Sequence, residues 1–171
     1  DRPGDPPLGY LRDPLGGRRY AVTAWTLGDA ASLEAAAAAG AVDQIDFDWY
    51  HTQPDGSVTA QHEDPGLVAA ARRHDLNLFA TVTNSTDSAS PFDRELAAAV
   101  LASPERRRRF VDDLLTLVRD MGYDGVDLDW EELRPADRDA FSGLVEELAG
   151  ALHAEGRFLS IAVMPKTSEP G

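Results

Sequence analysis

The sequence predicts an α/β fold in which parallel strands alternate with helices. Two observations carry this prediction: short runs rich in β-branched and aromatic residues recur along the chain, and longer segments with helical periodicity lie between them. A series of this kind makes right-handed crossovers and therefore a parallel sheet. The expected strands lie at about residues 20–26, 44–50, 77–83, 125–131 and 158–164, and the expected helices at about 29–39, 65–75, 93–121 and 136–155.

The folded part is expected to begin near residue 20. Residues 1–19 contain four prolines and four glycines, a composition typical of a linker or an extended arm. The whole chain has 171 residues and a hydrophobic fraction of 43%, which is enough for one domain with a buried core. We therefore assign residues 20–171 to a single folded unit.

The two longest helices carry the clearest boundary signals. In the third helix, Ser103 is a suitable cap, Pro104 suits a first turn, and Gly122 ends the apolar periodicity. The fourth helix ends at Gly156. Its apolar face is formed by Phe141, Leu144, Val145, Leu148 and Leu152.

Five strands and four helices fit two architectures. One is a five-stranded doubly wound sheet, which is complete at this length. The other is the first five strands of a (β/α)8 barrel, a fold that typically needs about 250 residues. Length favours the doubly wound sheet, whereas the residues at the strand ends favour the incomplete barrel.

Charge and composition exclude several classes of function. Lys plus Arg is 16 and Asp plus Glu is 30, so the formal net charge is −14. Nucleic acids and anionic membranes need a basic face, and no apolar run is long enough to insert into a membrane. The chain has no Cys, which excludes disulfides and thiolate chemistry. The four His share no ligand spacing, so neither a metal nor a cofactor is expected.

Carboxylates gather in the expected strand at 125–131. Because side chains alternate across a strand, Asp127, Asp129 and Glu131 share one face. Crowded like charges and desolvation both raise the pKa of a carboxyl group, so such a group keeps a proton that an isolated acid loses. Glu131 is the outermost of the three, at the strand end where barrel active sites lie, and could donate its proton to a leaving group.

Four acidic residues, Asp124, Asp127, Asp129 and Glu131, stand at the offsets DxxDxDxE. On the fourth strand of a βα series, this pattern resembles the signature of glycoside hydrolase family 18, the chitinase family. The resemblance extends over about residues 20–171. Residues 49–57, Asn84 and residues 162–166 are similar to the bacterial branch that lyses cell walls and spore cortex.

The resemblance implies a role for each acidic residue. Glu131 would protonate the glycosidic oxygen, and Asp129 would orient the 2-acetamido group of the substrate. Asp127 would hydrogen-bond to Asp129 and share its proton, while Asp124, with Gly125, would be structural. The nucleophile would be the acetamido oxygen of the substrate, the substrate-assisted exception to the two-carboxylate scheme. The implied bond is a β-1,4 linkage after N-acetylglucosamine, in chitin or peptidoglycan.

The ends of the first two strands supply candidates for substrate contact. If Asp46, Asp48 and Tyr50 face inward along their strand, Asp48 and Tyr50 reach the site and Trp49 packs outward. Trp25 ends the first strand, where it either stacks on a sugar or fills the core.

Three further residues have two readings each. Asn84 either binds sugar hydroxyls or turns the chain after the third strand. Met164 either lines the pocket floor or fills the core. Trp130, on the opposite face from the carboxylates, is expected to pack against helices.

The resemblance also implies a full barrel, of which this chain holds five strands. The Met-x-Tyr-Asp motif of the sixth strand in the family has no counterpart, since no Tyr follows Tyr123. We therefore expect a truncated gene product, a split gene or an excised fragment. An open barrel edge would expose strand amides and invite self-association.

Two other functions compete with a glycosidase. An incomplete barrel could be a carbohydrate-binding, lectin-like module, although the retained Glu131 argues against it. A doubly wound sheet could instead gather its carboxylates around Mg²⁺ for phosphoryl chemistry, but no Gly-rich phosphate loop follows the first strand. A polymeric sugar substrate implies secretion or association with the cell envelope. The chain begins at Asp1 and shows no signal peptide.

Overall fold

The computed structural model describes residues 22–26 and 28–163. The expected arm at 1–19 and the candidate Met164 lie outside the described residues. The strands are β1 (Thr23–Thr26), β2 (Gln44–Thr52), β3 (Val58–Ala60), β4 (Asn77–Thr83), β5 (Gly125–Asp129) and β6 (Phe158–Ile161). The helices are α1 (Ala30–Ala38), α2 (Pro65–Arg73), α3 (Arg94–Leu101), α4 (Pro104–Met121) and α5 (Arg138–Ala154), with a short 3₁₀ helix η2 (Pro135–Asp137).

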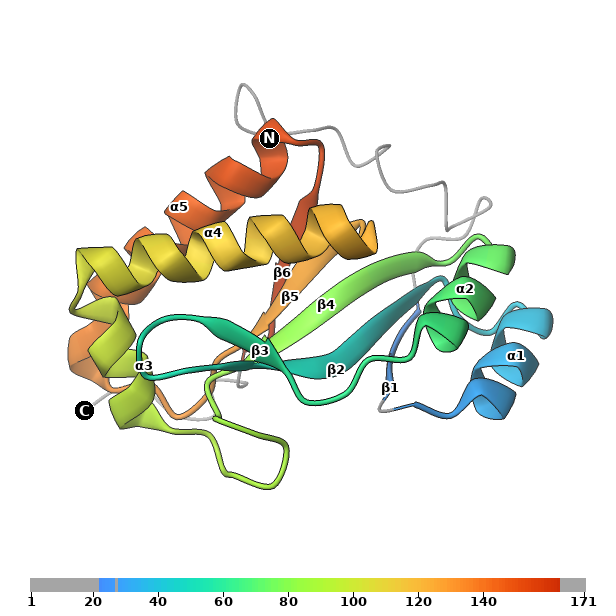
Figure 1. Cartoon of the computed structure of the whole chain (residues 1–171), viewed down its shortest axis with the longest axis horizontal. Helices are drawn as coiled ribbons and strands as arrows, with labels where there is room; N and C mark the ends of the chain where they lie inside the picture. Colours follow the sequence, from blue (N-terminus) through green and yellow to red (C-terminus); the bar gives the residue numbers. More distant parts are fainter. Residues whose placement is uncertain (1–21, 27, 164–171) are drawn as a thin grey trace.

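The order of the strands decides between the two expected architectures. Five strands run parallel in the order β1-β2-β4-β5-β6, and β3 adds antiparallel to β2 (Figure 1). Their spatial order is their order along the chain. A doubly wound sheet reverses its strand order at a switch point, and this sheet does not. The doubly wound alternative is therefore excluded, and the magnesium reading loses the fold on which it was built.

Right-handed crossovers that all progress in one direction place the helices on one face of the sheet. That face carries the core. Phe110 of α4 and Phe141 of α5 pack against Trp130, with ring centroids 5.1 and 6.2 Å apart. Trp130 is 3% exposed, so its expected packing against helices is confirmed. The opposite, inward face is left for the polar side chains of the strands.

The expected helix at 93–121 is in fact two helices. Asp93 accepts hydrogen bonds from the amides of Glu95 and Leu96 and so begins α3, and Ser103 caps α4. The break follows from Pro104, which disfavours helical backbone in the residue before it. Ser103 accordingly has extended backbone, with φ −112° and ψ 113°.

Strand β3 was not expected from the sequence. It follows a turn in which the Asp55 carboxylate accepts a hydrogen bond from the Ser57 amide and Gly56 has φ +85°. A Cβ on Gly56 would lie 2.4 Å from the carbonyl oxygen of Arg106, so the turn requires glycine there. Only three residues of β3 pair, which is too short for an alternation signal.

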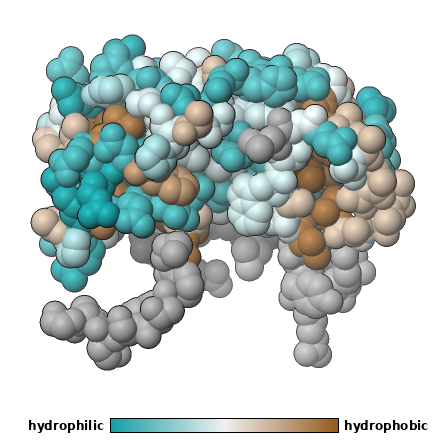
Figure 2. Space-filling model, turned by 90° about the horizontal axis from the view of Figure 1, so that it is seen from below, coloured by the Kyte–Doolittle hydropathy of each residue, from teal (hydrophilic) through white to brown (hydrophobic). Residues whose placement is uncertain are grey.

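On the face shown in Figure 2, hydrophilic residues are widespread, and apolar residues gather at the end that holds α1 and α2. Helix α1 is rich in alanine, and only Leu33 of its residues is buried. Among the helices that the structure describes, none has the length and apolar character to span a membrane.

Candidate active site

Inward-facing side chains form three levels across the sheet, because register partners on neighbouring strands point the same way. The lowest level holds Trp25, Asp46, Phe79, Gly125 and Phe158. The middle level holds Asp48, Thr81, Asp127 and Ser160, and the upper level holds His51, Thr83 and Asp129. The two upper levels are wholly polar, at the carboxyl ends of the strands where barrel enzymes place their chemistry.

Gly125 makes room for the lowest level. A Cβ at Gly125 would lie 2.6 Å from both the carbonyl oxygen of Phe158 and the ring of Phe79. Just before it, the Asp124 carboxylate accepts a hydrogen bond of 2.9 Å from the Leu78 amide, which ties the start of β5 to the start of β4. These contacts are of the structural kind that the motif implies for Asp124 and Gly125.

Asp127 lies at the centre of the middle level and is 3% exposed. Ser160 donates to its Oδ1 at 2.6 Å, and the Trp25 indole donates to its Oδ2 at 3.2 Å. Thr81 adds a weaker contact at 3.4 Å. Within the described residues no hydrogen bond joins Asp127 to Asp129, so the contact that the resemblance implies between them is not formed here. The Asp127 carboxylate is instead fixed by three strands.

Three neighbouring carboxyl groups have raised pKa values. Burial raises the pKa of Asp129 to about 6, and the charges of Glu131, Asp127 and Asp48 add to the shift. Burial also raises the pKa of Asp46 to about 7 and that of Asp48 above its usual range. No Arg or Lys forms an ion pair with any of them among the described residues. The cluster therefore holds protons near neutral pH, as crowded carboxylates do.

The raised pKa of Asp46 predicts a pH-dependent stability. The folded state keeps a proton that the unfolded chain loses above its pKa of 3.8, so the stabilisation is complete below about pH 4 and is lost as pH rises through 7. Asn at this position mimics the protonated form and can still accept the hydrogen bond from Gln44. We expect Asp46→Asn to increase the free energy of unfolding by about 1–3 kcal/mol at pH 8. Thermal melts at pH 3.5 should show no difference from wild type.

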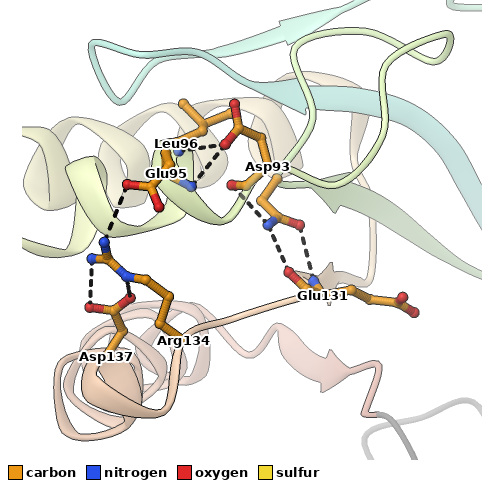
Figure 3. Close-up of polar contacts among 7 residues, drawn as sticks. Asp93, Glu95, Leu96, Glu131, Arg134 and Asp137 are labelled. Atoms are coloured by element: carbon orange, nitrogen blue, oxygen red, sulfur yellow. Dashed lines mark hydrogen bonds and ion pairs between the residues drawn. The ribbon is translucent and has the colours of Figure 1, made fainter.

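Asn84 holds the backbone of Glu131 at two points, which are the dashed lines that end on Glu131 in Figure 3. The Asn84 Oδ1 accepts from the Glu131 amide at 3.0 Å, and its Nδ2 donates to the Glu131 carbonyl at 2.9 Å. The same Nδ2 donates to the Asp93 carbonyl at 3.2 Å. This clamp takes the Glu131 backbone out of the sheet, so β5 ends at Asp129 rather than at residue 131 as expected.

The segment after Glu131 is also held to α3. Arg134 donates to Asp137 at 2.7 Å and to Glu95 at 3.2 Å (Figure 3). Arg94 of α3 forms an ion pair of 2.6 Å with Glu132. Glu132 has φ +56°, a left-handed conformation that is uncommon outside glycine. A sharp turn directly after Glu131 lets its side chain extend away from the clamp (Figure 3), and the residue is partly buried.

The structure corrects the expectation that Asn84 binds substrate. Its side chain is fully buried, and both of its amide hydrogens and its oxygen are used by Glu131 and Asp93. Asn84 is therefore a positioning residue. The alternative reading, a residue that turns the chain after its strand, is closer to the structure.

Tyr50 is also not in the site. The register between β2 and β4 shifts between Asp48 and Tyr50, so Tyr50 pairs with Val82 on the helix-facing side of the sheet. Its hydroxyl contacts the Tyr123 hydroxyl at 2.9 Å and donates to Glu63 at 3.1 Å. The expected alternation fails because a β-bulge inserts one residue and reverses the parity beyond it. His51 takes the inward position that was expected for Tyr50.

This correction makes a prediction for Tyr50→Phe. The variant removes a buried hydroxyl with two partners and leaves the inward face unchanged. We expect the free energy of unfolding to fall by about 1–2 kcal/mol in chemical denaturation. The affinity for oligosaccharides should equal that of wild type, and a clear loss of affinity would return Tyr50 to the site.

Sequence reasoning missed several inward-facing residues, namely His51, Thr81, Thr83, Ser85 and Ser160. The hydroxyl residues lie in apolar strands, and alternation alone would have placed Thr81, Thr83 and Ser160. The inward position of His51 depends on the bulge in β2, and no residue pattern in the sequence predicts that bulge. Asp48 lies on the inward face, as the alternation predicted, and so does Trp25, whose 59% exposure argues against the reading that it fills the core.

Comparisons with known proteins agree with this geometry. The family model described as glycosyl hydrolases family 18 matches residues 67–169. The sporulation-specific glycosylase YdhD of Bacillus subtilis is 36% identical over 120 residues, which are 70% of this chain and 28% of that protein. The alternating fold is shared with the spore cortex-lytic enzyme SleL of Bacillus cereus, with a TM-score of 0.78, 18% identity, and coverage of 86% of this chain and 35% of that one.

A chitinase from Chromobacterium violaceum has a TM-score of 0.73 and 24% identity over 83% of this chain and 45% of its own. The chain thus spans less than half the length of each of these proteins. The expected architecture, the first βα units of a (β/α)8 barrel, is confirmed.

Proposed function

The chain belongs to glycosyl hydrolases family 18, and on that premise we propose that it carries the acid half of a glycosidase that cleaves β-1,4 bonds after N-acetylglucosamine. One observation carries the proposal: Glu131, which is partly exposed, is clamped by its backbone beside Asp129 and Asp48, two carboxyl groups with raised pKa values. General acid catalysis needs such a fixed proton donor at a barrel mouth.

The proposed reaction is substrate-assisted. Glu131 donates its proton to the glycosidic oxygen as the bond from that oxygen to C1 breaks. The carbonyl oxygen of the substrate's own acetamido group bonds to C1, and Asp129 accepts a hydrogen bond from the acetamido N–H. Water then attacks C1 as the bond from C1 to the acetamido oxygen breaks, and the water gives a proton to Glu131; this restores both the acetamido group and the acid and retains the configuration at C1.

Supporting residues have proposed roles in the same reaction. The charge of Asp127 adds to the raised pKa of Asp129. The exposed Trp25 indole offers a surface on which a sugar ring can stack. Asp48 extends the acidic face toward the second strand. No cofactor enters the proposed mechanism.

Peptidoglycan is the favoured polymer because the relatives named above include a sporulation-specific glycosylase and a spore cortex-lytic enzyme. Chitin is the alternative, since a chitinase shares the fold. Either polymer places the protein outside the cell or in its envelope. Strands β1 and β6 are the edges of the described sheet, and we propose that they pair with further strands, from the same protein or from a second copy.

The test is product analysis by mass spectrometry. The protein would be incubated with N-acetylglucosamine hexamer and, separately, with peptidoglycan fragments, beside the Glu131→Gln variant. We expect shorter oligosaccharides from wild type only, with the β-anomer formed first. Binding of the hexamer without any product would identify a lectin-like module instead and would contradict the proposal.

A further inference from the structure

A cavity lies beside the inward-facing carboxyl groups, and Asp48 forms part of its lining. It has a volume of about 250 Å³ and is formed by the ends of β2 and β4 and by the loop that follows β4. We call it the His51 pocket, and it is lined by Asp48, His51, Thr83, Ser85, Ser88, Ser90, Pro91 and Phe92. It is smaller than the roughly 300–1,000 Å³ pockets that take drug-sized ligands, and it suits one ring-sized group.

One lining residue of the pocket, His51, has a ring nitrogen without a hydrogen-bond partner among the described residues. His51 is 2% exposed, and its Nδ1 contacts the Thr83 and Ser85 hydroxyls at 3.0 and 3.2 Å. Its Nε2 is buried and has no partner within the described part of the chain. A buried polar atom without a partner costs free energy, and this one is satisfied if a ligand supplies the missing contact.

The pocket lies next to the residue that positions the acid. Thr83 and Ser85 line it, and the residue between them, Asn84, clamps the Glu131 backbone. Asp48 also lines it and lies close enough to Asp129 to raise the pKa of that residue. This proximity makes the pocket the candidate site for the sugar unit next to the bond at Glu131.

The chemistry of the lining selects the ligand. Hydroxyls from Thr and Ser side chains, the Phe92 ring and a histidine suit a hydroxylated or acylated sugar unit. The lining holds the Asp48 carboxylate and no Arg or Lys, and burial lowers the pKa of His51, which keeps the imidazole neutral. A ligand carboxylate in this lining finds no cation to pair with, and the Asp48 carboxyl group repels it whenever that group is ionised.

We propose that the His51 pocket binds the sugar unit next to the cleaved bond through His51 Nε2 and accepts uncharged substituents but not a free carboxylate. This inference rests on the proposed function, because it takes the ligand to be the same polymer. For peptidoglycan it means that muramyl units with a blocked lactyl carboxyl are preferred over units with a free one.

The test measures binding in the Glu131→Gln variant, in which the proposed mechanism slows turnover of the ligand by about 10²–10⁴-fold. Calorimetry would compare N-acetylglucosamine hexamer with muramyl oligosaccharides whose lactyl carboxyl is either free or amidated. We expect the free carboxylate to weaken binding by about tenfold or more relative to the amide, as one unfavourable buried charge contact does. Equal affinity for the free acid and the amide would overturn the inference.

Adding His51→Phe should weaken binding of the neutral oligosaccharides by about tenfold, the change expected when one buried hydrogen bond is lost. The control is His153→Phe on α5, which should bind like the parent variant. If His51→Phe fails to fold, the ¹⁵N shift of His51 Nε2 in the parent variant gives the answer, because it should move on adding the hexamer. Hydrolysis by wild type together with an unmoved Nε2 signal would reject the pocket and leave the proposed function standing. Loss of all glycan binding and hydrolysis would reject both.

Discussion

Replacing Glu131 by glutamine is expected to lower the rate of oligosaccharide hydrolysis by about 10²–10⁴-fold, the usual contribution of a positioned general acid. Glutamine keeps the size of the side chain and the backbone contacts to Asn84, so the fold and the site are preserved. What is lost is the proton for the leaving group. Initial rates on N-acetylglucosamine hexamer measure this directly.

A matched control for this variant is Glu146→Gln on the exposed surface of α5. It makes the same chemical change away from the inward-facing carboxyl groups and should leave the rate unchanged. Thermal melting of both variants should match wild type. A Glu131→Gln enzyme with wild-type rates would remove Glu131 from the mechanism.

The second large effect is expected for Asn84→Ala. This change deletes three hydrogen bonds to buried backbone groups, two of them on Glu131, and should lower the free energy of unfolding by about 2–4 kcal/mol. It also releases the backbone that carries the acid. A displacement of about 1 Å can cost about 10²-fold in rate, so we expect kcat to fall by that order while KM changes little.

Asn77 provides the comparison that separates positioning from stability. It is equally buried, lies at the other end of β4, and donates to the Asp43 carbonyl at 3.3 Å. Asn77→Ala should lower stability by about 1 kcal/mol and leave the kcat of the folded enzyme unchanged. Equal kcat values for the two variants at a temperature where both are folded would show that Asn84 is only structural.

The sequence was sufficient for the parts of the fold that follow a period. Alternation along β5 placed Asp127 and Asp129 on one face, and the caps at Ser103 and Gly122 placed the limits of α4. The sequence favoured the incomplete barrel because acidic residues at a strand end indicate the position of an active site. Chain length alone had favoured the doubly wound sheet. The strand order has now decided between them.

The failures occur where a tertiary contact overrides a local period. A one-residue bulge in β2 turned Tyr50 outward and His51 inward, and no turn or glycine signal marks it. The clamp by Asn84 ended β5 two residues early, because a side chain 47 positions away replaced the sheet as the partner of the Glu131 backbone. Such long-range pairings leave no trace in the local sequence.

The most direct test of the central role given to Glu131 varies the leaving group. In a dinitrophenyl glycoside of N-acetylglucosamine oligomers, the leaving group is dinitrophenolate, which departs without protonation. A sugar leaving group needs a proton from the acid. We expect Glu131→Gln to lose about 10²–10⁴-fold on the hexamer and less than about tenfold in the departure of dinitrophenol, measured in the same enzyme preparation. Equal losses on both substrates would contradict the assignment of Glu131 as the proton donor.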